Sequence, residues 1–232
     1  MSLVLPFDTA TQATVVGLLA SGAQPIERRD DPEPGARPRH TQRLLALCAE
    51  ALAEAGAGWG DVTRIGVGVG PGSFTGLRIG VATARALGQA RGAETVTVST
   101  LAALARGVAG DAPPTRDVLA VLDARRGEAF AAPFAAGSPV APAAVSVDPP
   151  DLAGLAGPGW LAVGDGAVRY RGELERGGIE VPPDADPRHR VGGGPLVRLA
   201  ATATPVPVAT LVPEYVRLPD AEIHHRRVAS GP

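Results

Sequence analysis

The sequence predicts a mixed α/β protein in which helices cover the faces of a sheet. Two strand-like segments joined by a short polar turn open the chain, and strands then alternate with amphipathic helices from residue 62 onward. At 232 residues the chain can bury one good core or two small ones. Its net charge of −2 and hydrophobic content of 45% are ordinary for a globular protein.

The first part of the chain predicts a hairpin, a third strand and a helix. Pro6 lies inside the first strand, where its missing N–H is expected to cause a bulge or an early end. A solvated loop with three prolines is expected over 30–39. Apolar residues at three- and four-residue spacing predict a helix over 41–55. The strands are expected at 2–7, 13–19 and 24–28.

A strand, a sharp turn and a long helix form the central stretch. In the strand 62–70, Gly66, Gly68 and Gly70 alternate with apolar residues, which indicates a helix or ligand packed closely against one face. Ser73 is a good N-cap for a helix that runs to about Gly92.

Along that helix, small residues recur at every fourth position and form one ridge. Each interior glycine costs about 1 kcal/mol relative to alanine, so close approach of another backbone should offset the cost. We expect the ridge and the 41–55 helix to meet a partner protein. The predicted interface residues are Gly76, Leu77, Gly80, Val81, Ala84, Gly88, Leu44 and Cys48.

The rest of the chain predicts a second, smaller α/β lobe. We expect a first lobe over 1–110, joined by the C-terminal segment 195–222, a second lobe over 111–194 and a flexible tail over 223–232. Residues 111–114 are the boundary, and 135–160 are mostly irregular. The expected strands are 94–98, 118–122, 129–134, 161–163 and 214–218. The expected helices are 99–108, one that follows the Gly-Asp-Gly turn at 164–166 and runs to about 176, and 196–203.

The turn from Gly70 to Gly76 resembles a phosphate loop but fails the detailed patterns. The Walker Lys-Ser/Thr pair is absent, and the dinucleotide fingerprint needs glycine where Thr75 stands. Backbone amides at a helix start can still bind an anion without side-chain help. A tight turn with helix packing is the favoured interpretation, and anion binding stays open.

Few residues suggest catalysis. The single cysteine excludes an internal disulfide and a Cys-rich zinc site. No two of the four histidines have the spacing of a helical metal pair, and no Ser-His-Asp arrangement can be assembled. Near-neutral charge and 3% aromatic content argue against an autonomous RNA-binding surface. Neither a signal peptide nor a membrane span is expected, so we expect a cytoplasmic protein.

Several motifs, in this order, resemble the TsaB (YeaZ) family. The most specific is Gly-Pro-Gly-Ser-Phe-Thr-Gly-Leu-Arg-Ile-Gly over 70–80. The supporting motifs are Arg-His-Thr-Gln at 39–42, Asp-Ala-Arg-Arg-Gly-Glu at 123–128, Gly-Asp-Gly at 164–166 and Pro-Glu-Tyr-Val-Arg at 213–217.

The resemblance implies an actin/Hsp70-like (ASKHA) ATPase fold of two lobes, the second reduced. It implies a non-catalytic scaffold or activator subunit for tRNA threonylcarbamoyladenosine synthesis. Such a subunit binds the catalytic paralogue TsaD, is joined by the small ATPase TsaE, contacts tRNA only indirectly and forms a homodimer when alone. No cofactor is then required, or ATP or ADP with Mg²⁺ is shared with the partner.

In this fold Asp8 would stand where actin-like ATPases hold a phosphate- or metal-handling acid, although a hairpin turn cap is favoured. The candidate nucleotide contacts are Asp8, Gly72, Ser73, Asp123 and Asp165. The alternative function is an autonomous ATP-dependent transferase or metallopeptidase-like enzyme of the same fold. The His-x-x-x-His metal pair of the catalytic paralogue has no counterpart in this sequence.

Overall fold

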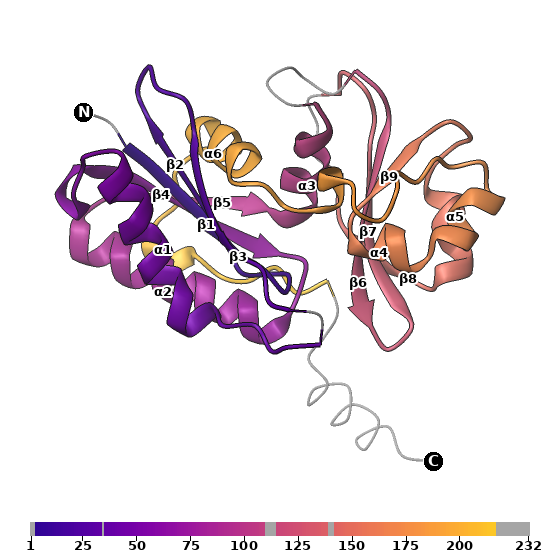
Figure 1. Cartoon of the computed structure of the whole chain (residues 1–232), viewed down its shortest axis with the longest axis horizontal. Helices are drawn as coiled ribbons and strands as arrows, with labels where there is room; N and C mark the ends of the chain where they lie inside the picture. The colour runs from indigo at the N-terminus through magenta and orange to yellow at the C-terminus, as the bar shows by residue number, and fades with distance from the viewer. Residues whose placement is uncertain (1–2, 34, 110–114, 139–141, 217–232) are drawn as a thin grey trace, which may run out of the picture.

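Two mixed β-sheets stand side by side in the computed structural model, which describes residues 3–33, 35–109, 115–138 and 142–216 (Figure 1). The first sheet has five strands in the order β3-β2-β1-β4-β5, and the second has four in the order β8-β7-β6-β9. We call the first sheet with its covering helices the first lobe and the second sheet with its helices the second lobe.

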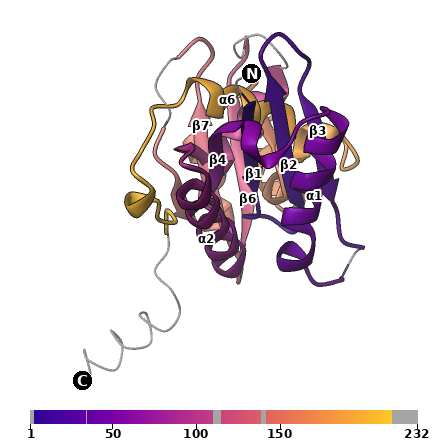
Figure 2. The same cartoon turned by 90° about the vertical axis from the view of Figure 1, so that its left-hand side faces the viewer.

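The first lobe is a three-layer unit. Strands β1, β2 and β3 pair antiparallel, whereas β4 and β5 run parallel to β1. Helices α1 and α2 cover one face of the sheet, and α6 covers the other (Figures 1 and 2). The bounds are β1 Leu3–Asp8, β2 Thr14–Ala20, β3 Ile26–Asp30, α1 His40–Glu54, β4 Val62–Gly70, α2 Phe74–Arg91, β5 Glu94–Ser99 and α6 Gly193–Thr202.

The second lobe is smaller and is joined to the first through α3 (Thr100–Ala109). One apolar cluster runs from Val98 of β5 through Leu101 and Leu104 of α3 to Val118 and Leu122 of β6, so the lobes share a core. The remaining bounds are β6 Val118–Arg125, β7 Glu128–Phe134, β8 Val145–Val147, β9 Leu161–Val163, α4 Asp165–Arg169 and α5 Arg171–Arg176. Short 3-10 helices lie at Trp59–Asp61, Pro149–Leu155, Pro187–His189 and Val208–Thr210.

Most expected elements are present within a few residues of their predicted ends, with two corrections. The single helix expected after β9 is divided at Tyr170 into α4 and α5. The closing strand expected from residue 214 is not formed over 214–216, where Glu214 N–H donates one bond to the Val69 carbonyl (2.7 Å). The predicted boundary 111–114, residues 217–218 and the tail 223–232 lie outside the described residues.

Pro6 interrupts one ladder of the central strand without ending the strand. Strand β1 pairs with β2 on either side of Leu5 and Pro6 but not at these two residues. On its other side β1 pairs with β4 without a break from Val4 to Phe7, Pro6 and Gly66 included, and the register shifts only between Leu3 and Val4. The missing donor therefore affects only the β2 side.

Other parts of the same chain pack against the glycines of β4 and α2. A Cβ on Gly66 would lie 2.9 Å from the Cβ of Ala200 in α6, which confirms the expected helix packing. A Cβ on Gly76 would lie 1.9 Å from the Thr9 carbonyl oxygen, and one on Gly88 would lie 2.6 Å from Thr95 Cγ2.

The prediction that this ridge meets a partner protein is therefore wrong. The close approach expected of the ridge occurs, but its partner is the sheet of the same chain. All eight predicted interface residues are buried within the first lobe: Gly76, Leu77, Gly80, Val81, Ala84, Gly88, Leu44 and Cys48.

Candidate functional site

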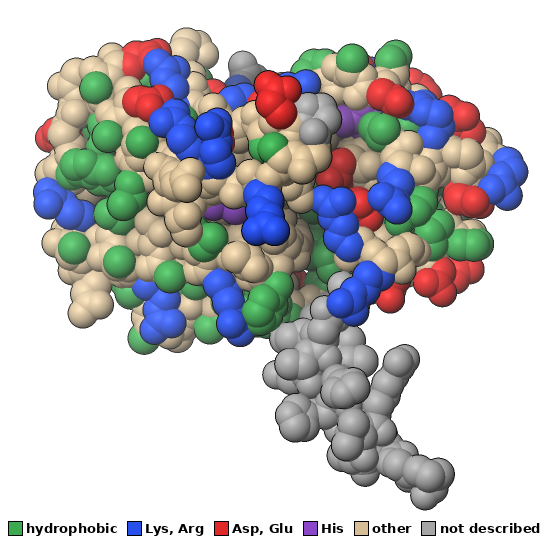
Figure 3. Space-filling view, turned by 60° about the horizontal axis from the view of Figure 1, so that its bottom comes forward, with side chains coloured by type: hydrophobic (Ala, Val, Ile, Leu, Met, Phe, Trp, Pro, Cys, Tyr) green, Lys and Arg blue, Asp and Glu red, His purple; other side chains and the backbone are tan. Residues whose placement is uncertain are grey.

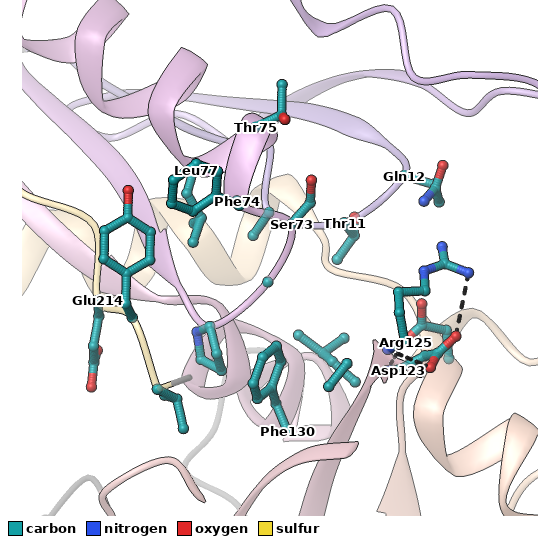
Figure 4. A pocket seen from close by; sticks show the side chains of 18 of the residues that line it. Thr11, Gln12, Ser73, Phe74, Thr75, Leu77, Asp123, Arg125, Phe130 and Glu214 are labelled. Carbon is teal, nitrogen blue, oxygen red and sulfur yellow. Dashed lines mark hydrogen bonds and ion pairs between the residues drawn. The ribbon is translucent and has the colours of Figure 1, made fainter. Parts of the chain in front are cut away.

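A cavity of about 750 Å³ opens between the two lobes. The first lobe lines it with the β1–β2 turn, the β4–α2 turn and the start of α2, and the second lobe contributes the β6–β7 hairpin and Asp165. The C-terminal segment 214–216 forms a further wall. In Figure 4, Phe74 and Leu77 lie on one side of the cavity, and Asp123 and Arg125 lie on the other.

The turn at the start of α2 is held against the β1–β2 turn. The Ser73 N–H donates to the Ala10 carbonyl (2.7 Å), and a Cβ on Gly72 would lie 2.4 Å from the same oxygen. Ser73 is the N-cap, because its Oγ accepts from the Gly76 N–H (3.3 Å). The amides of Ser73 and Gly76 are therefore engaged within the chain, which favours the tight turn over the phosphate loop.

The β6–β7 hairpin carries two arginines in an unusual backbone conformation. Arg125 and Arg126 have φ of 65° and 56°. Residues other than glycine and asparagine rarely adopt such positive φ values. Asp123 supports this turn by accepting from the Arg125 N–H (2.9 Å) and by pairing with Arg125 Nη1 (3.3 Å) and Arg169 Nη1 (3.4 Å).

The glycines around Asp165 allow its helix to touch β6. A Cβ on Gly164 would lie 2.0 Å from the Val121 carbonyl oxygen, and one on Gly166 would lie 2.6 Å from the Leu122 carbonyl carbon. This approach brings Asp165 Oδ1 to the Asp123 N–H (3.0 Å). Desolvation by the surrounding protein raises the pKa of the Asp165 carboxyl, and the charge of Asp123 adds to the shift.

Four of the five candidate nucleotide contacts line the cavity, namely Gly72, Ser73, Asp123 and Asp165. Asp8 does not, so its predicted nucleotide contact is wrong. Its side chain is 1% exposed and points into the core, where Oδ1 accepts from the Ala10 N–H and Oδ2 accepts from the Thr100 hydroxyl, both at 2.7 Å. Asp8 is a turn cap, and the Cβ that Gly68 lacks would lie 1.9 Å from Asp8 Oδ2.

Sequence reasoning missed a stacked cluster at the cavity rim. Arg78 Cζ lies 3.8 Å from the centre of the Phe74 ring, and the Phe74 and Tyr215 ring centres are 5.1 Å apart. Arg78 Nε also donates to the Tyr215 hydroxyl (3.2 Å). The four-residue spacing of Phe74 and Arg78 indicates a shared helix face, whereas nothing in the sequence brings Tyr215 to them.

Among the described residues, no three His, Cys, Asp or Glu side chains gather to hold a metal ion. His40 is buried, with Nδ1 2.8 Å from the Thr14 hydroxyl, and burial lowers its pKa. Within the described ranges, no helix combines the length and apolar composition that crossing a membrane requires.

The outward sides of α1 and α2 form a second candidate surface, on the face of the first lobe that is turned to the viewer in Figure 2. Leu45 is 51% exposed on α1. We call this surface the α1/α2 face and define it by the exposed residues Leu45, Ala49 and Ala53 of α1 and Ala82, Ala86 and Ala90 of α2.

Comparison with known proteins identifies the family. The family model of TsaD, tRNA N6-adenosine threonylcarbamoyltransferase, matches residues 32–158, more than half of the chain. An uncharacterized protein of Mycobacterium tuberculosis is 33% identical over 96% of this chain and 95% of its own length. The tRNA threonylcarbamoyladenosine biosynthesis protein TsaB of Escherichia coli is 37% identical over 56% of this chain and 54% of its own length.

The fold agrees with these sequence matches. YeaZ from Pseudomonas aeruginosa superposes with a TM-score of 0.76 at 27% identity, covering 93% of this chain and all of that one. The two mixed sheets with helices on their faces agree with the expected α/β fold of two lobes, the second one smaller. The chain belongs to the TsaB (YeaZ) family, which takes part in tRNA threonylcarbamoyladenosine biosynthesis.

Proposed function

We propose that this chain is a non-catalytic scaffold or activator subunit of tRNA threonylcarbamoyladenosine synthesis that binds the catalytic paralogue TsaD. The observation that carries the proposal is the match of the TsaD family model to residues 32–158, which runs from before α1 through α2 and α3 to beyond β8 of the second lobe. Paralogous domains present related surfaces, so a surface that pairs with its own copy can also pair with the paralogue.

The α1/α2 face is the docking surface in this proposal, and it replaces the buried ridge. Its exposed alanines recur every fourth residue on both helices, so another helix can approach closely. On α1, Glu50 and Glu54 are exposed beside Arg43 and Arg28 of the same chain, with which they form ion pairs, whereas the exposed charges on α2 are Arg78, Arg85 and Arg91. A two-fold or pseudo-two-fold partner that sets α1 against α2 therefore brings opposite charges together.

The same surface supports a homodimer when the chain is alone. TsaE is the third proposed partner, tRNA is reached through TsaD, and the assembly works in the cytoplasm. The reaction needs no cofactor resident in this chain, and ATP or ADP with Mg²⁺ shared with the partner is the alternative.

The proposal is tested with Ala49→Glu and Ala86→Glu. Each adds a charge on an exposed position, so the monomer should fold normally, but the charge would be buried without a counter-ion in the complex. We expect binding to the TsaD encoded in the same genome to weaken at least about tenfold in calorimetry. Stimulation of threonylcarbamoyl transfer by the chain should fall with it.

The control is Ala143→Glu, an equally small exposed residue on the second lobe, which should bind TsaD as the parent does. Parent-like binding by both helix variants would place the interface elsewhere. Transfer by the chain without TsaD would instead support the alternative of an autonomous enzyme.

A further inference from the structure

His40 begins α1 at a point where three parts of the first lobe meet. The residue is 4% exposed, and its Nδ1 lies 2.8 Å from the hydroxyl of Thr14, the first residue of β2. A Cβ on Gly76 of α2 would lie 3.5 Å from its Nε2. On the face shown in Figure 3, histidine side chains are visible only as small patches between their neighbours. The ring of His40 therefore fills the junction between the starts of α1, α2 and β2.

The second ring nitrogen of His40 is buried without a partner. In the part of the chain that the structure describes, Nε2 is the only buried side-chain nitrogen or oxygen that makes no hydrogen bond. The neutral ring can keep its proton on Nδ1 and leave Nε2 bare. The protonated ring carries an N–H at both nitrogens, so it would bury a donor that has no acceptor. The junction therefore fits the neutral ring and disfavours the charged one.

The charges around His40 do not compensate for this cost. Asp30, at the end of β3, attracts a positive charge on the ring, but it is already paired with Arg39 and Arg43. The Asp8 carboxyl of β1 is engaged by other partners. The groups that contact the ring from β2, the β1–β2 turn and α2 are uncharged, namely Thr14, Thr11 and Gly76.

The place of His40 links the start of α1 to pH. Burial lowers the pKa of His40 from its usual 6.5, and the Thr11 backbone and the charge of Asp30 oppose this shift only in part. The positive end of the 15-residue helix also disfavours a cation at its first residue. Local opening of the helix start brings the ring into water and removes these penalties. The opened form therefore binds the proton more readily, and opening becomes easier as the pH falls below 6.5.

We propose that neutral His40 is a positioning residue that holds the first turn of α1 in place, and that protonation of the ring releases this turn. The next turn of the helix carries Leu44, which is buried in the core, and Leu45, which is 51% exposed on the α1/α2 face. Release of the helix start displaces Leu45 and so removes part of the docking surface. The effect on docking rests on the proposed function, whereas the release of the turn does not.

Hydrogen exchange of the full chain without a partner tests the release. The protection factors of the backbone amides of residues 43–46 should fall by at most about tenfold between pH 7.5 and pH 5.5, because opening takes up one proton. An NMR titration of the ring in the parent should have its midpoint below 6.5. A midpoint at or above 6.5 would overturn the proposal. So would exchange at 43–46 that is as sensitive to urea as exchange at 84–91 of α2, because the opening would then not be local.

Two variants separate protonation from packing. His40→Asn keeps a polar group for the Thr14 hydroxyl but cannot be protonated, so the protection factors of residues 43–46 should no longer depend on pH. The matched control is Thr14→Val, which removes the partner of Nδ1 and keeps the histidine. Its helix start should open more readily at every pH and keep the pH dependence. The same pH profile in the parent and in His40→Asn would show that the role of His40 is structural only.

Docking extends the test to the proposed function. Below the midpoint of the ring titration, docking must release a proton, so the association constant should fall by up to about tenfold per pH unit. Sedimentation measures this for the chain alone, and calorimetry measures it for binding to TsaD. In His40→Asn this dependence should be absent, and the titrating groups of TsaD are common to both measurements.

The outcomes distinguish the two proposals. If the parent binds neither itself nor TsaD at pH 7.5, the proposed function fails and the effect on docking fails with it, while the exchange data still decide whether His40 holds the turn. If the parent docks and its docking has the same pH dependence as that of His40→Asn, the effect on docking is overturned alone.

Discussion

A carboxyl group in an apolar core is more stable in its neutral form, because burial penalises the charge. Asp8 is in this position between β1 and the start of α3. Desolvation raises its pKa, and the hydrogen bonds from Thr100 and Ala10 only partly oppose the shift. The residue therefore supports the hairpin turn and links the free energy of unfolding to pH.

The sign of that dependence follows from proton binding. Between the ordinary value of 3.8 and the raised pKa, the folded chain holds a proton that the unfolded chain has lost. The free energy of unfolding contributed by Asp8 therefore falls as the pH rises through this window. Asp8→Asn keeps an acceptor for Ala10 and an amide that can donate to the Thr100 hydroxyl.

We expect Asp8→Asn to be folded. As the pH rises from 4 to 7, its free energy of unfolding should fall less than that of the parent, because the variant lacks the Asp8 carboxyl that titrates. Urea unfolding at a series of pH values measures the difference. Equal pH dependence in parent and variant would show that Asp8 does not titrate in this range. The Asp165 carboxyl, which also has a raised pKa, is common to both proteins and cancels.

At the scale of the element, α2 can pack closely against the sheet because its glycines carry no side chains. The helix lies so close to the β1–β2 turn that the Thr9 hydroxyl donates to the Gly76 carbonyl (2.7 Å). Any side chain at this position must displace backbone atoms of Thr9, which cannot rotate away as a flexible side chain can.

Two glycine-to-alanine changes in helices should therefore have opposite effects. Gly76→Ala should lower the free energy of unfolding by about 1–3 kcal/mol through overpacking. Gly107→Ala in α3 should raise it by about 0.5–1 kcal/mol, because the nearest atom, Pro195 Cγ, lies at an ordinary 3.8 Å. Urea unfolding measures both. A neutral Gly76→Ala would mean that α2 can move away from the sheet.

The extent of agreement between sequence and structure depends on the range of the interaction. Helices α1 and α2 were predictable because apolar spacing, the Ser73 cap and the Gly92 stop are local signals. The segment that contacts the glycine ridge could not be predicted. The four-residue spacing of small residues indicates close approach of another backbone, but it does not identify that backbone. Here it is Thr9, 67 residues away from Gly76 in the sequence.

The same limit applies to the candidate site. Gly72, Ser73, Asp123 and Asp165 could be selected because each belongs to a glycine-containing or charged turn motif, and such motifs are local in the sequence. The orientation of Asp8 toward the core could not be predicted, and neither could the contact of Tyr215 with Arg78. The two side chains of that contact are 137 residues apart in the sequence, and no local pattern joins them.

At the scale of the whole molecule, α3 makes the two lobes one packed body. Its Leu101 and Leu104 are fully buried in the cluster that also contains residues of both sheets. Separation of the lobes would expose this apolar surface to water, at roughly 25 cal/mol per Å². We therefore expect the lobes to unfold together.

The tryptophans allow this prediction to be checked, since the chain has one in each lobe. Trp59→Phe leaves Trp160 as the reporter of the second lobe, and Trp160→Phe leaves Trp59 as the reporter of the first. Fluorescence and circular dichroism should give coincident urea transitions within each variant. A fluorescence transition separated from the circular dichroism transition would show that the lobes unfold independently.

Cys48 gives the molecule a further property through its place on the inner side of α1. The only thiol of the chain is fully buried, and burial raises its pKa to about 12. Thiol reagents need an accessible thiolate, so they should not react with the native protein. A cysteine introduced at an exposed position would thus be a unique attachment point for a probe, and slow alkylation of Cys48 itself would time the opening of the first lobe.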